Sequence, residues 1–255
     1  MCVAFLAACG GDDERTDVGR PSGDIDGGSF GVGPDIDASM SSNLDGAAAP
    51  DGYVPDGAIE EAFDGGTKRT FYWADWTAAS TGVDGGATGF LAIPSGGVQV
   101  TYSGDLMDVQ LQPSTRNFWA VKESYTSAAV DKAPDNTDAL LIDGVVDGYG
   151  EVVFSRPVKD PVFAFASLGA LDNGSAASYR FDAPFLLLSQ GKGFYTGDGW
   201  LEKQPNNTLS GQEANGVIGF EGMFTKISWV TPTIEPWHAL TIGVAEDTPV
   251  TLAAP

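Results

Sequence analysis

From residue 68 onward, the hydrophobic residues of the chain fall into short runs separated by clusters of Gly, Asp, Asn and Pro. The runs are rich in aromatic and β-branched residues, as in "GGVQVTYSG", "EVVFS", "VFAFASLG", "FTKISWV" and "HALTIGV". In the first run, Val98, Val100 and Tyr102 alternate with the polar Gln99 and Thr101, which places the two kinds on opposite faces of a strand. No segment carries a long apolar stripe of helical period. The pattern therefore predicts many short β-strands.

The spacing of these runs indicates how the strands are arranged. Turn signals such as "DNGS" and "PNNT" separate them at intervals of roughly 8–12 residues, and no internal repeat points to a propeller. We therefore predict one all-β domain over residues 68–246, a two-sheet, jelly-roll-like β-sandwich, with residues 247–255 as a tail. Phe224, Ile227 and Trp229 do not keep strict alternation, which predicts a β-bulge between them.

Residues 10–67 have a different composition. Gly, Asp, Ala, Pro and Ser dominate stretches such as "GDIDGG" and "LDGAAAPDGYVPDGA", and the few large apolar residues show no period of 2 or 3.6. Such a segment cannot bury enough apolar surface to offset the entropy that it would lose on ordering. We predict a disordered linker that precedes the sandwich and holds it away from the point of attachment.

The chain opens on "MCVAFLAACGGDDERTD", where a short apolar run ends at Cys9 and acidic residues follow. Leu6-Ala7-Ala8-Cys9 resembles the bacterial lipobox, in which the cysteine sulfur receives a diacylglycerol and becomes the first residue of the mature chain. The resemblance implies that residues 1–9 are part of a lipoprotein signal, that the mature domain has no thiol, and that the protein is anchored in a bacterial cell envelope, at the outer surface or in the periplasm. A chance Leu-Ala-Ala-Cys is the alternative.

The charge narrows the choice of partners. The formal net charge is −22, so nucleic acid and anionic lipid would be repelled. We therefore expect no nucleic-acid partner and contact with a membrane only through an N-terminal lipid. Calcium is the one cofactor that the acidic loops admit, and its candidate ligands are Asp138, Asp143 and Asp147 in "DNTDALLIDGVVDGYGE". Their spacing matches no defined calcium loop, so solvated turns are the alternative.

Groups suited to catalysis are sparse. His238 is the only histidine, no Gly-x-Ser-x-Gly motif occurs, and one His without a Cys in the domain does not make an ordinary zinc site. In "EPWHALTIGV" this residue begins an apolar strand, where a structural role on an edge strand is favoured. We predict no enzyme and assign no catalytic residue. A glycan-active hydrolase that uses two carboxylates stays as a third interpretation.

Aromatic residues in a Gly-rich segment are the best candidates for ligand binding. Phe194, Tyr195 and Trp200 stand among glycines and polar residues in "GKGFYTGDGWLEK", and the C–H face of a pyranose stacks on such rings. Alternatively, they cap the sandwich. Glu213 in "LSGQEANG" is a candidate ligand-binding carboxylate, with a structural role in a tight turn as the alternative. The run "FYWADW" is assigned to the core.

The second half of the chain resembles a known family. The stretches "SRPVKDPVFAFASLGA", "FDAPFLLLSQGKGFYTG", "NTLSGQEANGVIGFEGMFTKISWV" and "PTIEPWHALTIGV" are similar to the extracellular β-sandwich domain of bacterial PEP-CTERM proteins. The resemblance implies an exported protein associated with envelope, matrix or exopolysaccharide. The family's sorting tail does not follow "TIGVAEDTPVTLAAP", so attachment is expected through Cys9. The family's Glu-Gly is Glu213-Ala214 here, and we expect Asn215 to take the positive φ.

These observations together predict a binding or structural module at the cell surface, most readily associated with polysaccharide of the matrix or envelope. A calcium-dependent adhesion or assembly module that binds a cell-surface protein is the alternative. The two interpretations differ in whether chelation of calcium abolishes binding.

Overall fold

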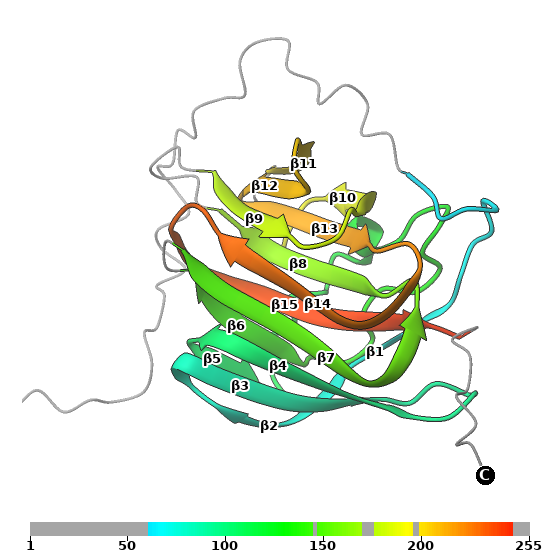
Figure 1. Cartoon of the computed structure of the whole chain (residues 1–255), viewed down its shortest axis with the longest axis horizontal. Coiled ribbons are helices and arrows are strands. Elements are labelled where there is room, and N and C mark those ends of the chain that lie inside the picture. Colours follow the sequence, from blue (N-terminus) through cyan, green and yellow to red (C-terminus); the bar gives the residue numbers. More distant parts are fainter. Residues whose placement is uncertain (1–60, 145–146, 170–175, 196–198, 247–255) are drawn as a thin grey trace, which may run out of the picture. The chain divides into compact units, whose positions relative to one another are not determined.

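The computed structural model describes residues 61–144, 147–169, 176–195 and 199–246, which form two antiparallel β-sheets packed face to face (Figure 1). The seven-stranded sheet contains, in spatial order, β10 (Leu186–Gly191), β13 (Ala214–Gly219), β8 (Val162–Leu168), β15 (Glu235–Ala245), β6 (Ala139–Gly144) and β5 (Asp108–Gln110), with β1 (Phe71–Trp73) pairing to β15. The eight-stranded sheet contains β11 (Trp200–Gln204), β12 (Thr208–Gln212), β9 (Ala177–Phe181), β14 (Met223–Thr231), β7 (Gly148–Lys159), β4 (Val98–Leu106), β3 (Gly82–Leu91) and β2 (Asp75–Ser80).

Eight of these strands are connected as a jelly roll. β6 pairs with β15, β7 with β14, β8 with β13 and β9 with β12, each pair antiparallel. Successive strands of these eight alternate between the sheets, with β6, β8, β13 and β15 in one and β7, β9, β12 and β14 in the other, except that β9 and β12 are neighbours in the same sheet. A long hairpin wrapped in this way is the jelly-roll topology, and β10 and β11 add one strand to each sheet beside β13 and β12. The predicted fold is confirmed.

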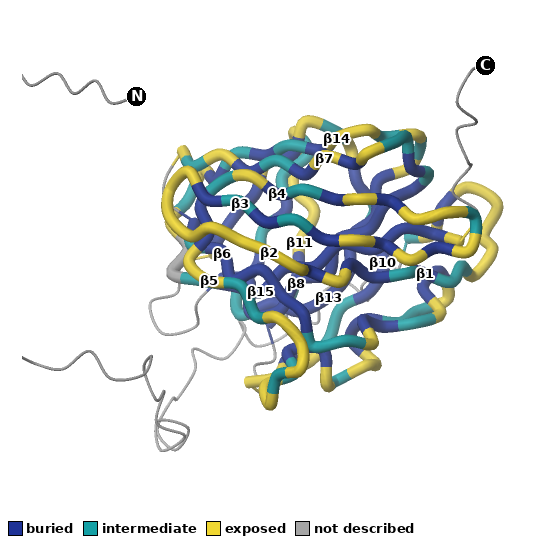
Figure 2. Tube along the Cα trace, turned by 90° about the horizontal axis from the view of Figure 1, so that it is seen from below, coloured by how far each residue is buried: buried dark blue, intermediate teal, exposed yellow. Residues whose placement is uncertain are grey.

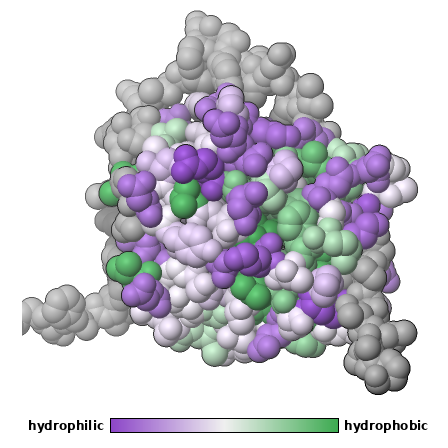
Figure 3. Space-filling model, viewed as in Figure 1, coloured by the Kyte–Doolittle hydropathy of each residue, from purple (hydrophilic) through white to green (hydrophobic). Residues whose placement is uncertain are grey.

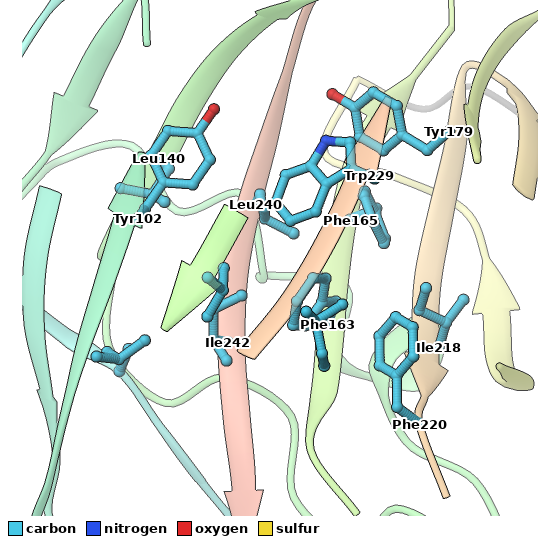
Figure 4. Packing of buried hydrophobic residues seen from close by; sticks show 14 of the residues in the cluster. Tyr102, Leu140, Phe163, Phe165, Tyr179, Ile218, Phe220, Trp229, Leu240 and Ile242 are labelled. Carbon is cyan, nitrogen blue, oxygen red and sulfur yellow. The ribbon is translucent and has the colours of Figure 1, made fainter. Parts of the chain in front are cut away.

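The main core lies between the two sheets. Phe163 and Phe165 point into it from β8 and meet Tyr179 and Trp229 of the opposite sheet (Figure 4). The rings of Phe163 and Trp229 are 5.8 Å apart in a T-shaped contact, a favourable geometry for aromatic pairs. This aromatic layer removes a large apolar area from water and is the main reason that the two sheets stay together.

A second core covers the outer side of the seven-stranded sheet. Ala164 and Ala166 alternate with the phenylalanines of β8 and point to this side, where their small side chains allow close packing of Phe118 and its neighbours. The residues that cover the sheet on this side come mainly from the irregular segment 111–138, which contains the 3₁₀-helix η3 (Lys122–Tyr125), and the sheet's own strands supply the rest of the core. Because both faces of this sheet are covered, β8 and β13 are buried along their whole length. In the other sheet, β3, β7 and β14 mix buried positions with more exposed ones, and β2 is exposed except at Trp76 (Figure 2).

The structure also tests the finer predictions. The expected bulge is present in β14, where the pairing with β7 shifts between Phe224 and Lys226. Trp73 and Trp76 of "FYWADW" are buried, as expected. The sandwich, however, begins earlier than residue 68. Phe63 is buried in the second core, and the backbone N–H of Glu61 donates to the carbonyl of Leu187 at 2.9 Å. Residues 61–67 therefore belong to the fold rather than to the linker.

Candidate functional site

The sandwich brings two of the predicted aromatic residues together with two that the sequence did not single out. Phe194 and Tyr195 form the turn after β10, and their rings meet edge to face with centroids 5.0 Å apart. Phe194 contacts Phe118 at 5.8 Å, Tyr195 contacts Trp237 at 5.7 Å, and Phe118 and Trp237 are themselves 5.8 Å apart. These four residues, here called the aromatic cluster, lie on the outer side of the seven-stranded sheet.

The inner half of the aromatic cluster is fixed and its outer half reaches solvent. Phe118 is fully buried, and the hydroxyl of Tyr125 donates a hydrogen bond to its carbonyl at 3.3 Å. Trp237 of β15 is partly buried against the same layer. Phe194 and Tyr195, in contrast, keep 38% and 37% of their surface exposed. The two outer rings are therefore held in place by packing from below while part of each stays available to a ligand.

Two charged groups flank the aromatic cluster. The guanidinium carbon of Arg116 lies 5.8 Å from the centre of the Phe118 ring, a cation–π distance. Partial burial raises the pKa of Tyr195; Arg116 opposes this rise and Glu213 adds to it. The charges of Arg116 and Glu213 therefore both affect the ionisation of Tyr195. The site combines ring surface, a hydroxyl, a hydrogen-bond donor and an acceptor, which is the set of groups that binds a hydroxyl-rich ligand.

Glu213 is part of a strained turn between β12 and β13. Its φ is 50°, its backbone N–H donates to the carbonyl of Gly169 at 3.1 Å, and its carboxylate accepts a hydrogen bond from the hydroxyl of Ser167. The expectation that Asn215 has the positive φ is wrong, because Glu213 itself occupies the left-handed region. The side chain of Asn215 is buried instead, accepts the backbone N–H of Ser167 at 3.0 Å and donates to the Glu213 carbonyl at 3.1 Å.

Trp200 lies at the first position of β11, where its backbone pairs with Gln212. Its side chain is half-buried. The preceding Gly199 is in such close contact with the turn that an added Cβ would lie 1.8 Å from the carbonyl oxygen of Gln212 and 2.4 Å from that of Glu213. Trp200 and Glu213 are therefore neighbours through the backbone.

The three candidate calcium ligands occupy different environments. Asp138 is fully buried, and its carboxylate accepts backbone N–H groups from Gln112 at 2.6 Å and Trp76 at 3.0 Å. Asp143 lies in β6 and Asp147 in the turn before β7. Within the described ranges, no three His, Cys, Asp or Glu side chains are arranged to hold a metal ion. Asp138 joins β2 to the segment after β5, and calcium binding by the three aspartates stays a prediction.

His238 is structural, but the expectation of an edge strand is wrong. β15 lies inside the seven-stranded sheet, between β8 and β6. The imidazole is fully buried, and its Nε2 lies 2.9 Å from the hydroxyl oxygen of Tyr179 in the opposite sheet. Burial lowers the pKa of His238 to about 3, so the ring is neutral at physiological pH.

Sequence reasoning missed Phe118, Trp237 and Arg116. Phe118 and Arg116 belong to the irregular segment 111–138, whose hydrophobic residues follow neither a strand nor a helix period. Trp237 belongs to β15, and the sequence does not indicate which face of this strand is buried. No spacing along the chain indicates that these residues meet the turn at Phe194. Only the wrapping of the jelly roll places them together.

Comparisons with known protein families, curated proteins and solved structures found no match. The resemblance to the PEP-CTERM β-sandwich domain therefore stays a prediction. Cys9, the linker up to residue 60 and the tail 247–255 lie outside the described residues. In the part of the chain that the structure describes, no helix is long and apolar enough to cross a membrane.

Proposed function

We propose that the protein is a lipid-anchored binding or structural module of the bacterial cell surface and that it associates with polysaccharide of the matrix or envelope. The observation that carries this proposal is the aromatic cluster. Phe194 and Tyr195 expose parts of their rings beside Arg116, and a pyranose would stack its C–H face on a ring while its hydroxyls bond to the charged groups.

The packing of the aromatic cluster favours binding over a simple capping role. A cap would bury its rings as fully as Phe118 is buried, but both outer rings keep more than a third of their surface exposed. Because the rings are supported from below, a ligand would order few additional side chains when it binds. That lowers the entropy lost on association.

The test is a glycan array probed with the full chain, once with calcium and once with a chelator. We expect specific binding to a class of glycan in both conditions, weakened about tenfold in Tyr195→Ala and reduced in Trp200→Ala. Phe90→Ala is the matched control, because Phe90 is an exposed aromatic residue of β3 in the other sheet. Glycan binding that disappears with the chelator would show that calcium takes part in recognition and would point to the acidic loops. No binding in either condition overturns the proposal.

The proposed anchor has its own test. A diacylglyceryl group on Cys9 would send the protein expressed in a bacterial host into the detergent phase of a Triton X-114 extract. The Cys9→Ala variant, which has no thiol to acylate at that position, is expected in the aqueous phase. Equal partitioning of the two proteins would refute the lipid anchor without bearing on glycan binding.

A further inference from the structure

Tyr149 stands between two hollows on the outer face of the eight-stranded sheet, the face that carries β7 and β14 in Figure 1. It follows Gly148 at the start of β7, and 50% of its surface is exposed. One hollow, of about 400 Å³, lies over β3, β4 and the start of β7, and the other, of about 240 Å³, lies over β7, β14 and β9. Tyr149 lines both hollows and therefore connects them.

A hydrogen bond of its hydroxyl holds the ring of Tyr149 in position. The hydroxyl donates a hydrogen bond of 2.6 Å to Oε2 of Glu151, and the same oxygen forms an ion pair of 2.8 Å with Lys226 of β14. Lys226 first, and Tyr149 second, hold the pKa of Glu151 below its ordinary value, so the carboxylate stays charged and keeps both partners. An exposed aromatic side chain with a fixed hydroxyl is a preorganised surface for stacking.

Backbone forms much of the lining of the larger hollow. Gly85, Gly104 and Gly148 are among its lining residues. At Gly104 the backbone requires glycine, because φ is 145° and an added Cβ would lie 2.4 Å from the carbonyl oxygen of Tyr149. Ser103 lines the same hollow from β4 and can hydrogen-bond to a hydroxyl group.

The smaller hollow is lined by polar groups at fixed positions. Tyr149 of β7 pairs with Val230 of β14, which pairs with Arg180 of β9, so the three side chains form one row across the sheet. In the neighbouring row, the hydroxyl of Ser228 donates to Asp182 at 2.7 Å and its backbone N–H donates to the same carboxylate at 3.1 Å. Figure 3 shows hydrophilic groups next to hydrophobic ones across this face.

We propose that this face binds a neutral polysaccharide, with one sugar ring stacked on Tyr149 and the adjoining sugars in the two hollows. The inference rests on the proposed glycan binding but assigns a second site on the sheet opposite the aromatic cluster. The charge distribution selects the ligand: Asp84, Asp105 and Asp147 are the charged residues among the described lining of the larger hollow, and Arg180 is accompanied by Asp182 in the smaller one. A uronic-acid chain would be repelled, whereas neutral hydroxyls can bond to carboxylates and guanidinium alike.

Native affinity electrophoresis of the full chain tests the site, because so acidic a protein migrates well in native gels. The gels contain neutral galactomannan or xyloglucan, or acidic alginate. We expect retardation by a neutral polymer and none by alginate. Tyr149→Ala should bind about tenfold or more weakly and Tyr149→Phe about threefold more weakly, since the ring stays but loses its tether to Glu151. Phe90→Ala, an exposed aromatic on the same sheet outside both hollows, is expected to bind like the wild type.

The pattern of variants separates this inference from the proposed function. If Tyr195→Ala weakens binding while Tyr149→Ala leaves it unchanged at an unchanged melting temperature, the polysaccharide function stands and the Tyr149 site is refuted. If Tyr149→Ala weakens binding, the site is supported whatever Tyr195→Ala does. Stronger retardation by alginate than by the neutral polymers overturns the charge argument. If no polymer retards the wild type, both proposals fail.

Discussion

His238 makes the stability of the protein depend on pH. It is fully buried beside Phe165 and Tyr179, and burial lowers its pKa to about 3, compared with about 6.5 in an unfolded chain. Between these two values the unfolded chain binds a proton that the folded chain does not. The contribution of His238 to the free energy of unfolding is therefore fully present above about pH 6.5 and falls by about 1.4 kcal/mol for each pH unit below it.

Urea unfolding of the wild type and His238→Gln at pH 7.5 and pH 5.0 measures this effect. Glutamine does not titrate, so the stability of the wild type relative to the variant should shrink by about 2 kcal/mol between the two pH values. The comparison with the variant cancels the titration of the acidic groups that both proteins share. A difference that stays constant with pH would show that the buried imidazole accepts a proton in the folded state.

Asp138 has the opposite pH dependence. Burial, and then the nearby Asp75, raise the pKa of Asp138 to about 6, although the N–H groups of Gln112 and Trp76 oppose the rise. The pKa of Asp138 is about 6 in the folded chain and near 4 in the unfolded chain, so between these pH values the folded chain binds a proton that the unfolded chain does not. The contribution of Asp138 to the free energy of unfolding therefore increases as the pH falls.

The variant Asp138→Asn should lose this dependence. Its amide NH₂ would face one of the two backbone N–H groups, so we expect the free energy of unfolding at pH 7 to drop by about 1–3 kcal/mol. Urea unfolding at pH 7 and pH 5 checks both statements. A variant as stable as the wild type at pH 7 would contradict the bridging role of this carboxylate.

At the scale of elements, the turn between β12 and β13 combines backbone strain with one side-chain hydrogen bond. Glu213 has φ of 50°, Ser167 in the bulged end of β8 has φ of 64°, and the Ser167 hydroxyl donates to the Glu213 carboxylate. Glu213→Gly relieves about 1 kcal/mol of backbone strain and loses a hydrogen bond of similar worth, so its stability should stay within about 0.5 kcal/mol of the wild type.

Glu213→Ala separates the two contributions, because it loses the hydrogen bond and keeps the strain. We expect a loss of about 1–2 kcal/mol in urea unfolding. The same pair of variants tests the second role proposed for this residue. If both variants bind glycans as the wild type does, Glu213 is only a turn residue. If both variants bind glycans weakly while Glu213→Gly is as stable as the wild type, the Glu213 carboxylate is part of the binding site.

The fold could be predicted from the sequence because its signal is local. The alternation of Phe163 and Phe165 with Ala164 and Ala166 indicates a strand and its two faces, and the second core explains why the small residues are also buried. Phe194 and Tyr195 of the aromatic cluster could be predicted from their Gly-rich segment, but the Tyr149 site could not, because it depends on which face of the sheet is covered. The run "GYGEVVFS" has apolar residues on both faces, so nothing local indicates that Tyr149 points to solvent.

At the scale of the whole molecule, the two proposed sites lie on opposite sides of the sandwich. The aromatic cluster packs on the outer side of the seven-stranded sheet, and Tyr149 stands on the outer face of the eight-stranded sheet. The two sheets are joined through an aromatic core, so the sites are held in a fixed relation. One polysaccharide chain that binds one face leaves the other face free for a second chain.

A monomer of this protein should therefore cross-link a neutral polysaccharide. When the protein is added to a dilute solution of galactomannan or xyloglucan, whichever it binds, light scattering is expected to rise because polysaccharide chains are bridged. An excess of protein should reverse this rise, because each binding segment of the polysaccharide is then occupied by a separate monomer. Tyr149→Ala and Tyr195→Ala each keep one site, so each should bind without raising the scattering. Light scattering on a size-exclusion column checks that the wild type is a monomer, as this prediction requires. Cross-linking by either single-site variant would mean that a dimer, and not two opposed faces, bridges the chains.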